Sequence, residues 1–327
     1  MPEKDAVEKG KRSQIRRLWK TVFDDTDEFV QFYFRQVYED DNALVIEKGG
    51  QVVSALQMLP YTMTFCGEEI PVAYISGACT LPSEQGKGLM KQLLQKAVSE
   101  MERKKTALSA LIPAGKGLFE YYRAHGYTEV FEYSTETYTR NEPIASDDIF
   151  VHQNNKPDEI TYAYLERQLR KRPMAIQHSY DDFILILKDL EIDNGQLFVA
   201  SDSGGQPAGM AFVSTQEIKT NAEESSILIK EILYDTEAVK EHLLHEITIR
   251  HNLVRAIYRT PVRQHLPTFP YGMARVIDAE RLIGLWLAAH PESELSVNDM
   301  RSMNIHTLTA HLTGYSDRAA YMSLMLD

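Results

Sequence analysis

The stretch ACTLPSEQGKGLM, residues 78–90, decides how the first half of the chain folds. Residues 70–81 are mostly apolar and predict a β-strand, while the apolar spacing of residues 89–104 predicts a helix. Gly86 and Gly88 lie between them, so the chain makes a tight turn from strand to helix. The first N–H groups of a helix have no partner within it and lie at the positive end of its dipole. The stretch therefore predicts a site for an anion such as a pyrophosphate.

Known phosphate-binding loops differ from this one, although Lys87 or Lys91 could add positive charge to the site. A P-loop requires a glycine six positions before its lysine and a serine or threonine after it. Here those positions hold Leu81 and Gly88, and no dinucleotide-binding glycine pattern is present. The alternative that stays open is an ordinary strand-to-helix turn without a ligand.

The elements around this stretch predict a mixed α/β domain of about 140 residues. Helices and strands alternate here with short turns between them. The expected elements are two helices in residues 12–38, strands at 43–47 and 52–59 joined by a Lys-Gly-Gly-Gln turn, strands at 61–65 and 70–81, a helix at 89–104, a strand at 107–112, a helix at 117–125 and a strand after Gly126.

A second copy of this pattern is predicted after a polar, proline-containing linker at residues 141–158. The segments 44–58 and 197–214 are both apolar strands joined through Gly-Gly-Gln, and the two motifs lie about one domain length apart. This favours an internal duplication, against the alternative that Gly-Gly hairpins are simply common. Residues 234–240 of the second copy lack the glycines of the first, which predicts one active unit and one scaffolding unit.

The remaining segment, from about residue 267 to the end, is too short to build a large core of its own. A strand at residues 273–278 is expected to lead into a helix, and a further helix is expected at residues 305–312. We therefore expect this segment to pack on the rest of the molecule.

Charge and composition exclude several classes of protein. Lysine and arginine number 35 against 47 aspartate and glutamate, a formal net charge of −12. This argues against nucleic-acid binding and against polybasic attachment to membranes, and it suits a cationic substrate. Two cysteines allow no disulfide framework, and no apolar run predicts a signal peptide or a membrane-spanning helix. The expected location is the cytoplasm.

A metal site is not expected either. His242, His245 and Glu246 resemble a zinc motif, but Ile249 stands where the second histidine of His-Glu-x-x-His would fall. Partly exposed histidines on one helix are the better interpretation. Cys79 lies in a predicted strand and is expected to be buried rather than nucleophilic.

Two short motifs resemble the GNAT acetyltransferases. Residues 85–90 are similar to the Gln/Arg-x-x-Gly-x-Gly/Ala loop of that family, with Gln85 and Gly88 matching and Met90 departing from it. A large apolar residue at that last position is usual in the Eis-like (enhanced intracellular survival) branch. Residues 122–127 are similar to the family's Tyr-x-x-x-Gly-Phe/Tyr motif. The duplicated organisation and the C-terminal segment also fit the Eis-like branch.

The resemblance implies an α/β (α+β) protein of tandem GNAT folds, each a mixed, mainly antiparallel sheet with flanking helices, followed by a small C-terminal α/β segment. It places a catalytic domain at residues 1–142, a degenerate GNAT domain at 143–267 and a short sterol-carrier-like domain at 268–327. The implied co-substrate is acetyl-CoA, without a metal. A homo-oligomer, as large as a hexamer, is expected from the family.

The resemblance also implies roles for particular residues. Backbone N–H groups near Ala78, Cys79 and Thr80 would hold the pantetheine and polarise the thioester carbonyl. Tyr122 is the candidate acid for the departing thiolate, against an alternative role in packing. The terminal carboxylate at Asp327 would help to deprotonate the amine. The residues expected to bind the pyrophosphate are Gln85, Gly86, Lys87, Gly88, Leu89, Met90 and Lys91.

The acceptor is expected to be a small-molecule amine or a lysine side chain. An acidic cluster at residues 24–28 contains Asp25 and Glu28, which would rim the amine pocket in the resembling branch. Capping of the next helix by one of these carboxylates is the alternative. A second reading of the whole chain is a non-catalytic protein that binds acetyl-CoA or serves as a scaffold.

Overall fold

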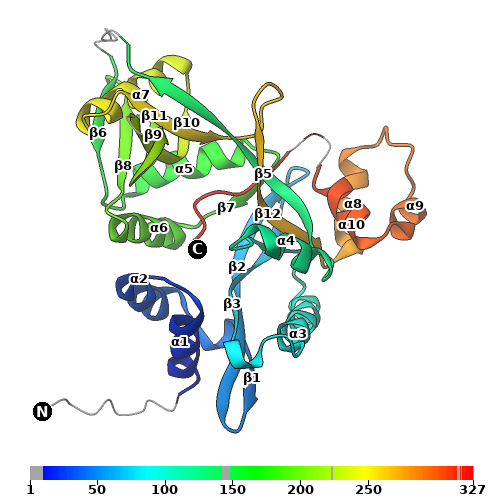
Figure 1. Ribbon diagram of the computed structural model, residues 1–327. Coiled ribbons are helices and arrows are strands. Elements are labelled where there is room, and N and C mark those ends of the chain that lie inside the picture. Colours follow the sequence, from blue (N-terminus) through cyan, green and yellow to red (C-terminus); the bar gives the residue numbers. More distant parts are fainter. Residues whose placement is uncertain (1–9, 142–147, 222–223, 315–316, 318, 327) are drawn as a thin grey trace, which may run out of the picture.

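The computed structural model describes residues 10–141, 148–221, 224–314, 317 and 319–326 (Figure 1). Thirteen strands in this part of the chain form one mixed sheet with flanking helices, as predicted for a tandem α/β fold. The strand order is β13-β7-β2-β3-β4-β12-β5-β11-β10-β9-β8-β6, and β1 pairs with β2 beside this path.

The first unit contains the elements expected from the sequence around the glycine-rich turn. It has helical segments at both ends of a three-stranded antiparallel meander, followed by a parallel strand. Its elements are α1 (Lys11–Val22), α2 (Asp27–Phe32), a π-helical turn (Tyr33–Val37), a 3-10 turn (Asp40–Asn42), β1 (Ala43–Lys48), β2 (Gln51–Phe65), β3 (Glu68–Thr80), a 3-10 turn (Pro82–Glu84), α3 (Leu89–Arg103), β4 (Leu108–Leu111), α4 (Lys116–Arg123) and β5 (Thr128–Thr139).

The second unit and the C-terminal segment complete the chain. The second unit consists of β6 (Phe150–Gln153), α5 (Glu159–Arg170), β7 (Met174–Gln177), α6 (Tyr180–Ile192), β8 (Gln196–Ser201), β9 (Pro207–Asn221), β10 (Glu224–Tyr234), α7 (Glu237–Arg250) and β11 (Arg255–Thr260). The C-terminal segment consists of β12 (Thr268–Val276), α8 (Ala279–Ala289), α9 (Val297–Ser302), α10 (Ile305–Leu312) and β13 (Ala320–Tyr321).

The pairing pattern confirms the predicted duplication. In the first unit, β1, β2 and β3 pair antiparallel in sequence, α3 follows, and β4 returns parallel to β3. In the second unit, β8, β9 and β10 pair antiparallel, α7 follows, and β11 returns parallel to β10. Both Gly-Gly-Gln sequences lie in the turn that opens the meander, between β1 and β2 and between β8 and β9.

The two units are joined by strands that cross between them. β5, which ends the first unit, pairs with β11 of the second. β12, which follows the second unit, lies between β4 and β5 in the first. The C-terminal segment is thus part of the first unit's sheet, and the predicted boundaries at residues 142 and 267 stay a prediction.

Side-chain alternation along β2 places helices on both faces of the first unit. Ala55 packs in a cluster with α1 and α2, whereas Leu56 and Met58 pack against α3. Figure 1 shows α1 and α2 on one side of β2 and β3 and α3 on the other.

Some elements differ from the prediction. β2 is one continuous strand that contains Pro60, whereas two strands were predicted here. On one side β2 pairs with β1 through residues 51–57 and with β7 through residues 62–63, so Pro60 falls in the gap between these two neighbours. Proline therefore lies where β2 has no neighbour on that side. Residues 150–153 of the predicted linker form β6, an edge strand that pairs only with β8. An edge strand needs few apolar residues, so the polar sequence of residues 150–153 did not predict a strand.

The prediction of partly exposed histidines on α7 was wrong. His242 and His245 are both buried, because α7 carries buried side chains around most of its circumference. His242 Nδ1 lies 2.8 Å from the carbonyl oxygen of Ala238, and His245 Nδ1 lies 3.4 Å from the hydroxyl of Tyr138. Within the described residues, no group of three or more histidine, cysteine or acidic side chains is placed to hold a metal.

Residues 319–326 lie in the interior between the two units, where β13 pairs with β7 (Figure 1). The hydroxyl of Tyr321 donates a hydrogen bond to the fully buried carboxylate of Glu231, and the guanidinium of Arg172 lies 3.6 Å from the centre of the Tyr321 ring. His178 Nε2 lies 2.9 Å from the carbonyl oxygen of Ser323. No helix among the described residues is both long and apolar enough to cross a bilayer.

Candidate active site

The candidate active site lies where the parallel strands β3 and β4 diverge. The two strands pair in parallel only from Val72 to Ile75 on β3, which face Leu108 to Leu111 on β4. β3 continues to Thr80, so its last residues have no partner strand on the β4 side. Their backbone polar groups are left available to something other than the sheet.

A β-bulge shapes this end of β3. Ala55 of β2 faces Cys79 and Gln57 faces Ser76, so β3 holds one residue more than β2 over this interval. Gly77 lies in the bulge with φ +58°, and a Cβ there would overlap the indole ring of Trp19 on α1. The bulge therefore depends on a glycine for its backbone conformation and for its contact with α1.

Gly77→Ala is expected to lower the free energy of unfolding by about 3 kcal/mol, from left-handed strain plus overpacking against Trp19. Gly49→Ala is the matched control, because Gly49 has the same φ of +58° but no atom near its Cβ position. We expect the control to lose only about 1 kcal/mol. Urea unfolding measures both values, and equal losses would show that the Trp19 contact is unimportant.

The glycine-rich turn presents free N–H groups at the start of α3. Gly86 and Gly88 have φ of +74° and +75°, and Gly88 is the N-cap residue without a capping side chain. Within the described chain, the backbone N–H groups of residues 86–91 form no hydrogen bond to the protein. They are therefore available to an anion at the positive end of the helix dipole.

Side chains hold this turn in place from outside. Glu84 forms ion pairs with Lys48 and with Lys87, whose ammonium also donates to the carbonyl oxygen of Ser83. Gln85 Nε2 donates to the carbonyl oxygen of Thr80 over 3.2 Å, which ties the turn to the end of β3. The Lys87 ammonium thus faces Glu84, away from the start of the helix.

A cavity of about 640 Å³ lies against the turn and the end of β3. It combines an apolar wall with backbone polar groups, as small-molecule sites do. The residues around it are Val22, Phe23, Ala78, Cys79, Thr80, Glu84, Gln85, Gly86, Gly88, Leu89, Met90, Lys91, Leu118, Tyr121, Tyr122 and His125.

Tyr122 reaches this cavity from α4. Its side chain is buried among Tyr121, Tyr127 and α3, and its hydroxyl has no hydrogen-bond partner among the described residues. Burial raises the pKa of the Tyr122 phenol well above its ordinary value, so it stays protonated. Cys79 is buried, as predicted, and burial likewise raises the pKa of its thiol to about 12, which disfavours the thiolate.

Most of the predicted cofactor-binding residues meet at this cavity. Asp327 lies outside the described residues, and Lys87 does not line the cavity and pairs its ammonium with Glu84. The predicted residues that line the cavity are Ala78, Cys79, Thr80, Gln85, Gly86, Gly88, Leu89, Met90, Lys91 and Tyr122. Six further residues line the cavity without having been predicted as site residues: Val22, Phe23, Glu84, Leu118, Tyr121 and His125. Tyr121 immediately precedes the second motif and His125 lies within it, one helical turn further on.

The acidic cluster begins immediately after the cavity wall formed by Val22 and Phe23. Asp25 accepts a hydrogen bond of 2.6 Å from the Trp19 indole, whereas Glu28 is exposed at the start of α2. The expected carboxylate cap of α2 was wrong: the hydroxyl of Thr26 caps it, since a threonine oxygen reaches the N–H of Phe29.

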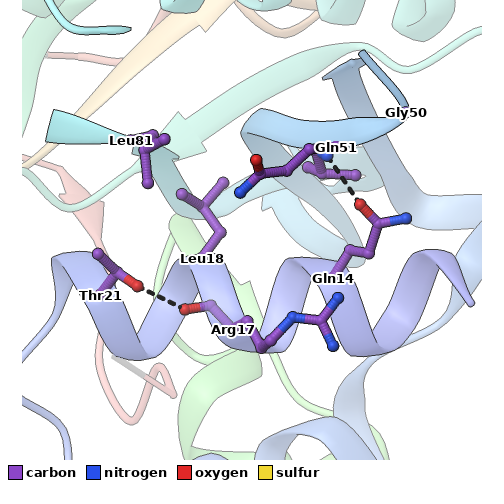
Figure 2. A pocket seen from close by; sticks show the side chains of 8 residues that line it. Gln14, Arg17, Leu18, Thr21, Gly50, Gln51 and Leu81 are labelled. Carbon is purple, nitrogen blue, oxygen red and sulfur yellow. Dashed lines mark hydrogen bonds between the residues drawn. The ribbon is translucent and has the colours of Figure 1, made fainter. Parts of the chain in front are cut away.

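A second cavity of about 640 Å³ lies along α1 and the turn between β1 and β2. Figure 2 shows Gln14, Arg17 and Thr21 on α1 opposite Gly50 and Gln51. Its lining contains neither a tyrosine nor the start of a helix. The cavity at the glycine-rich turn is therefore the better candidate for chemistry.

Known proteins with a similar sequence or fold include acetyltransferases. Residues 4–130 match the family described as acetyltransferase (GNAT) domain. Similar solved structures are a GCN5-related N-acetyltransferase from Anabaena variabilis (16% identity, 83% of this chain and 71% of that chain, TM-score 0.68), a probable N-acyltransferase from Enterococcus faecalis (17%, 82% and 70%, 0.66) and Eis1 from Mycobacterium abscessus (13%, 83% and 72%, 0.63). No curated protein matches the sequence.

Within residues 4–130 the first unit therefore matches the acetyltransferase (GNAT) domain, and this match supports an acyltransferase. At these identities the solved structures show a shared fold. The GNAT fold uses an acyl-coenzyme A, and the free N–H groups at the start of α3 suit its pyrophosphate.

Proposed function

We propose that the protein transfers an acetyl group from acetyl-CoA to a primary amine of a cationic small molecule or a lysine side chain. The observation that carries this proposal is the run of unpaired N–H groups at residues 86–91 beside the cavity that Tyr122 lines. The first supports binding of a pyrophosphate, and the second supplies an acid within the same space.

The proposed reaction is a direct transfer. The amine nitrogen attacks the thioester carbonyl carbon and loses a proton to solvent. The carbon–sulfur bond breaks, the sulfur takes the proton of the Tyr122 hydroxyl, and the Tyr122 phenolate then takes a proton back from solvent. Backbone N–H groups near Ala78 and Thr80 would stabilise the oxyanion, since β3 has no partner strand there. Because the pKa of Cys79 is raised, an acyl-cysteine intermediate is not part of this proposal.

The acidic residues beside the cavity support a cationic acceptor. Glu28 is exposed and has no ion-pair partner among the described residues, so its charge is available to a passing amine. Asp25 is already bound to Trp19 and would act mainly through its charge. The net charge of −12 favours the same class of substrate.

Glu28→Gln is expected to raise the KM for a polyamine such as spermidine about threefold, because an exposed charge contributes less than about 1 kcal/mol. The KM for acetyl-CoA should not change. Glu292→Gln, at another exposed glutamate in the loop between α8 and α9, is the matched control. Steady-state kinetics at low and high salt measure the effect; a polyamine KM equal to that of the control would remove Glu28 from the acceptor site.

We further propose an Eis-like arrangement, in which the second unit and the C-terminal segment support the first, within a homo-oligomer. The strands that cross between the units favour such mutual support. Sedimentation velocity tests the oligomer, and a monomer at all concentrations would contradict it.

The activity itself is tested by following thiol release from acetyl-CoA with a panel of amines. We expect turnover with at least one polyamine, aminoglycoside or lysine peptide, and none with the corresponding alcohols. Calorimetry with acetyl-CoA is run beside it. Tight binding without turnover would favour the non-catalytic alternative, and absence of binding would contradict the proposal.

A further inference from the structure

A second groove, of about 540 Å³, opens beside the candidate acetyl-CoA site and carries positive charge. It runs between one face of α3, the turn after α4, β12 and the start of α10. Its charged or titratable lining residues, apart from the buried Tyr127, are Lys91, His125, Arg275 and His306, and no carboxylate lines it. In a chain with a net charge of −12, two cations, Lys91 and Arg275, in a groove without a carboxylate point to an anionic ligand.

The cationic groups of this groove are not neutralised by the protein. Lys91 and Arg275 form no ion pair with any described carboxylate, although many other lysines and arginines of the chain do. The Nε atom of Arg275 is buried and has no hydrogen-bond partner among the described residues. The same is true of His125 Nε2. Buried donors are normally satisfied, so an anionic ligand is a physical reason for the unpaired Nε–H of Arg275. His125 Nδ1 faces the carbonyl oxygen of Tyr121, so Nε2 of the neutral ring is an acceptor and does not add to this argument.

Arg275 is held in position by residues of the Tyr-x-x-x-Gly-Tyr motif at residues 122–127. Its Nη1 donates to the carbonyl oxygen of His125 over 2.5 Å. Gly126 has φ +85°, and a Cβ at this residue would come within 2.6 Å of the same Nη1 atom. Glycine at this position therefore admits the guanidinium against the backbone, where a side chain would displace it.

The groove continues from the candidate site. Lys91 and His125 line both spaces. Lys91, Gln95 and Ser99 follow one another at four-residue spacing along α3, so this wall extends about 12 Å from the first turn of the helix. In coenzyme A the ribose ring joins the pyrophosphate to the adenine and carries the 3′-phosphate. If the pyrophosphate binds at residues 86–91, the 3′-phosphate is therefore within reach of this groove.

We propose that this groove binds the 3′-phosphate end of the acyl-CoA, with Arg275 and Lys91 as its charged partners and His306 beside them. The enzyme then distinguishes coenzyme A from 3′-dephospho-coenzyme A. This inference rests on the proposed function of the neighbouring cavity. It assigns to the C-terminal segment, through β12 and α10, a direct part in binding the co-substrate.

The test compares binding of coenzyme A and 3′-dephospho-coenzyme A by isothermal titration calorimetry. The unaltered protein should bind coenzyme A about 10- to 30-fold more tightly, because a doubly charged phosphate meets two unpaired cations. Arg275→Gln should reduce that preference to about threefold or less while leaving the affinity for 3′-dephospho-coenzyme A unchanged, which also reports an intact site. Arg275→Lys should restore part of the preference.

Arg281→Gln, at an exposed arginine on α8 outside the groove, is the matched control and should keep the full preference. Equal affinity of the unaltered protein for both nucleotides would overturn the inference, as would a preference that survives Arg275→Gln or an equal loss of both affinities in that variant. If the unaltered protein binds neither nucleotide, the proposed function fails first, and the ligand of the groove fails with it.

Discussion

Gly88→Glu is expected to weaken the binding of acetyl-CoA about 100-fold more than Gly88→Gln does, and Gly88→Gln itself should weaken it no more than about fivefold. Gly88 is the N-cap residue of α3, and no atom lies within 4 Å of its Cβ position, so both side chains have room. Both also meet the same backbone strain at φ +75°, about 1 kcal/mol. The variants differ only in charge.

The charge matters because a carboxylate at this place would compete with the pyrophosphate for the same N–H groups. A charge about 6 Å from a phosphate, at an effective dielectric constant of about 20, repels it by about 2.7 kcal/mol, which corresponds to about 100-fold in affinity. A negative charge at a helix N-terminus otherwise stabilises the helix. Thermal unfolding should therefore show Gly88→Glu to be no less stable than Gly88→Gln, and calorimetry measures the affinities. Equal affinities of the two variants would mean that the anion binds elsewhere.

The strand-to-helix turn could be predicted from sequence because its signals are local. The signals follow one another directly in the sequence: an apolar run, two glycines and then apolar residues at helical spacing. The structure has β3, the turn and α3 at these positions, as expected. The duplication could be predicted for a similar reason, since each Gly-Gly-Gln hairpin is a local signal that occurs twice.

The parts that could not be predicted depend on contacts between distant residues. Gly77 makes its bulge against Trp19, and Gly126 receives the guanidinium of Arg275, which is far away in the sequence. β12 lies between β4 and β5 because it pairs with both strands, and the spacing of apolar residues in the sequence does not show which strands pair.

Two of the candidate site residues show how local competition alters an expected role. Lys87 was expected to add charge to the anion site, but Glu84 lies three residues before it and pairs with its ammonium. Asp25 was expected to rim the amine pocket, but the Trp19 indole lies close enough to bind its carboxylate. An acid three residues before a lysine is visible in the sequence; the contact between Trp19 and Asp25, six residues apart, depends on how the chain turns after the end of α1.

Tyr122→Phe is expected to lower kcat for amine acetylation by 100- to 1,000-fold, the range for removal of a general acid. The KM for acetyl-CoA should change less than about threefold, because the ring stays and only a hydroxyl without a protein partner is lost. Tyr127→Phe is the matched control. Tyr127 is also buried beside Tyr122, but its hydroxyl lies 2.8 Å from that of Ser109, and it does not line the cavity. This variant should lose about 1 kcal/mol of stability and keep its kcat.

The pH dependence separates an acid from a packing residue. Burial raises the pKa of Tyr122, so its phenol remains protonated from pH 6 to pH 9 and produces no alkaline fall in kcat over that range. Tyr122 protonates the thiolate that leaves. A thiol of lower pKa leaves readily as a thiolate, so protonation by Tyr122 then accelerates the reaction less. The effect of Tyr122→Phe should therefore be smaller with an acetyl thioester of an acidic aromatic thiol than with acetyl-CoA. An equal effect with both donors would assign Tyr122 to packing.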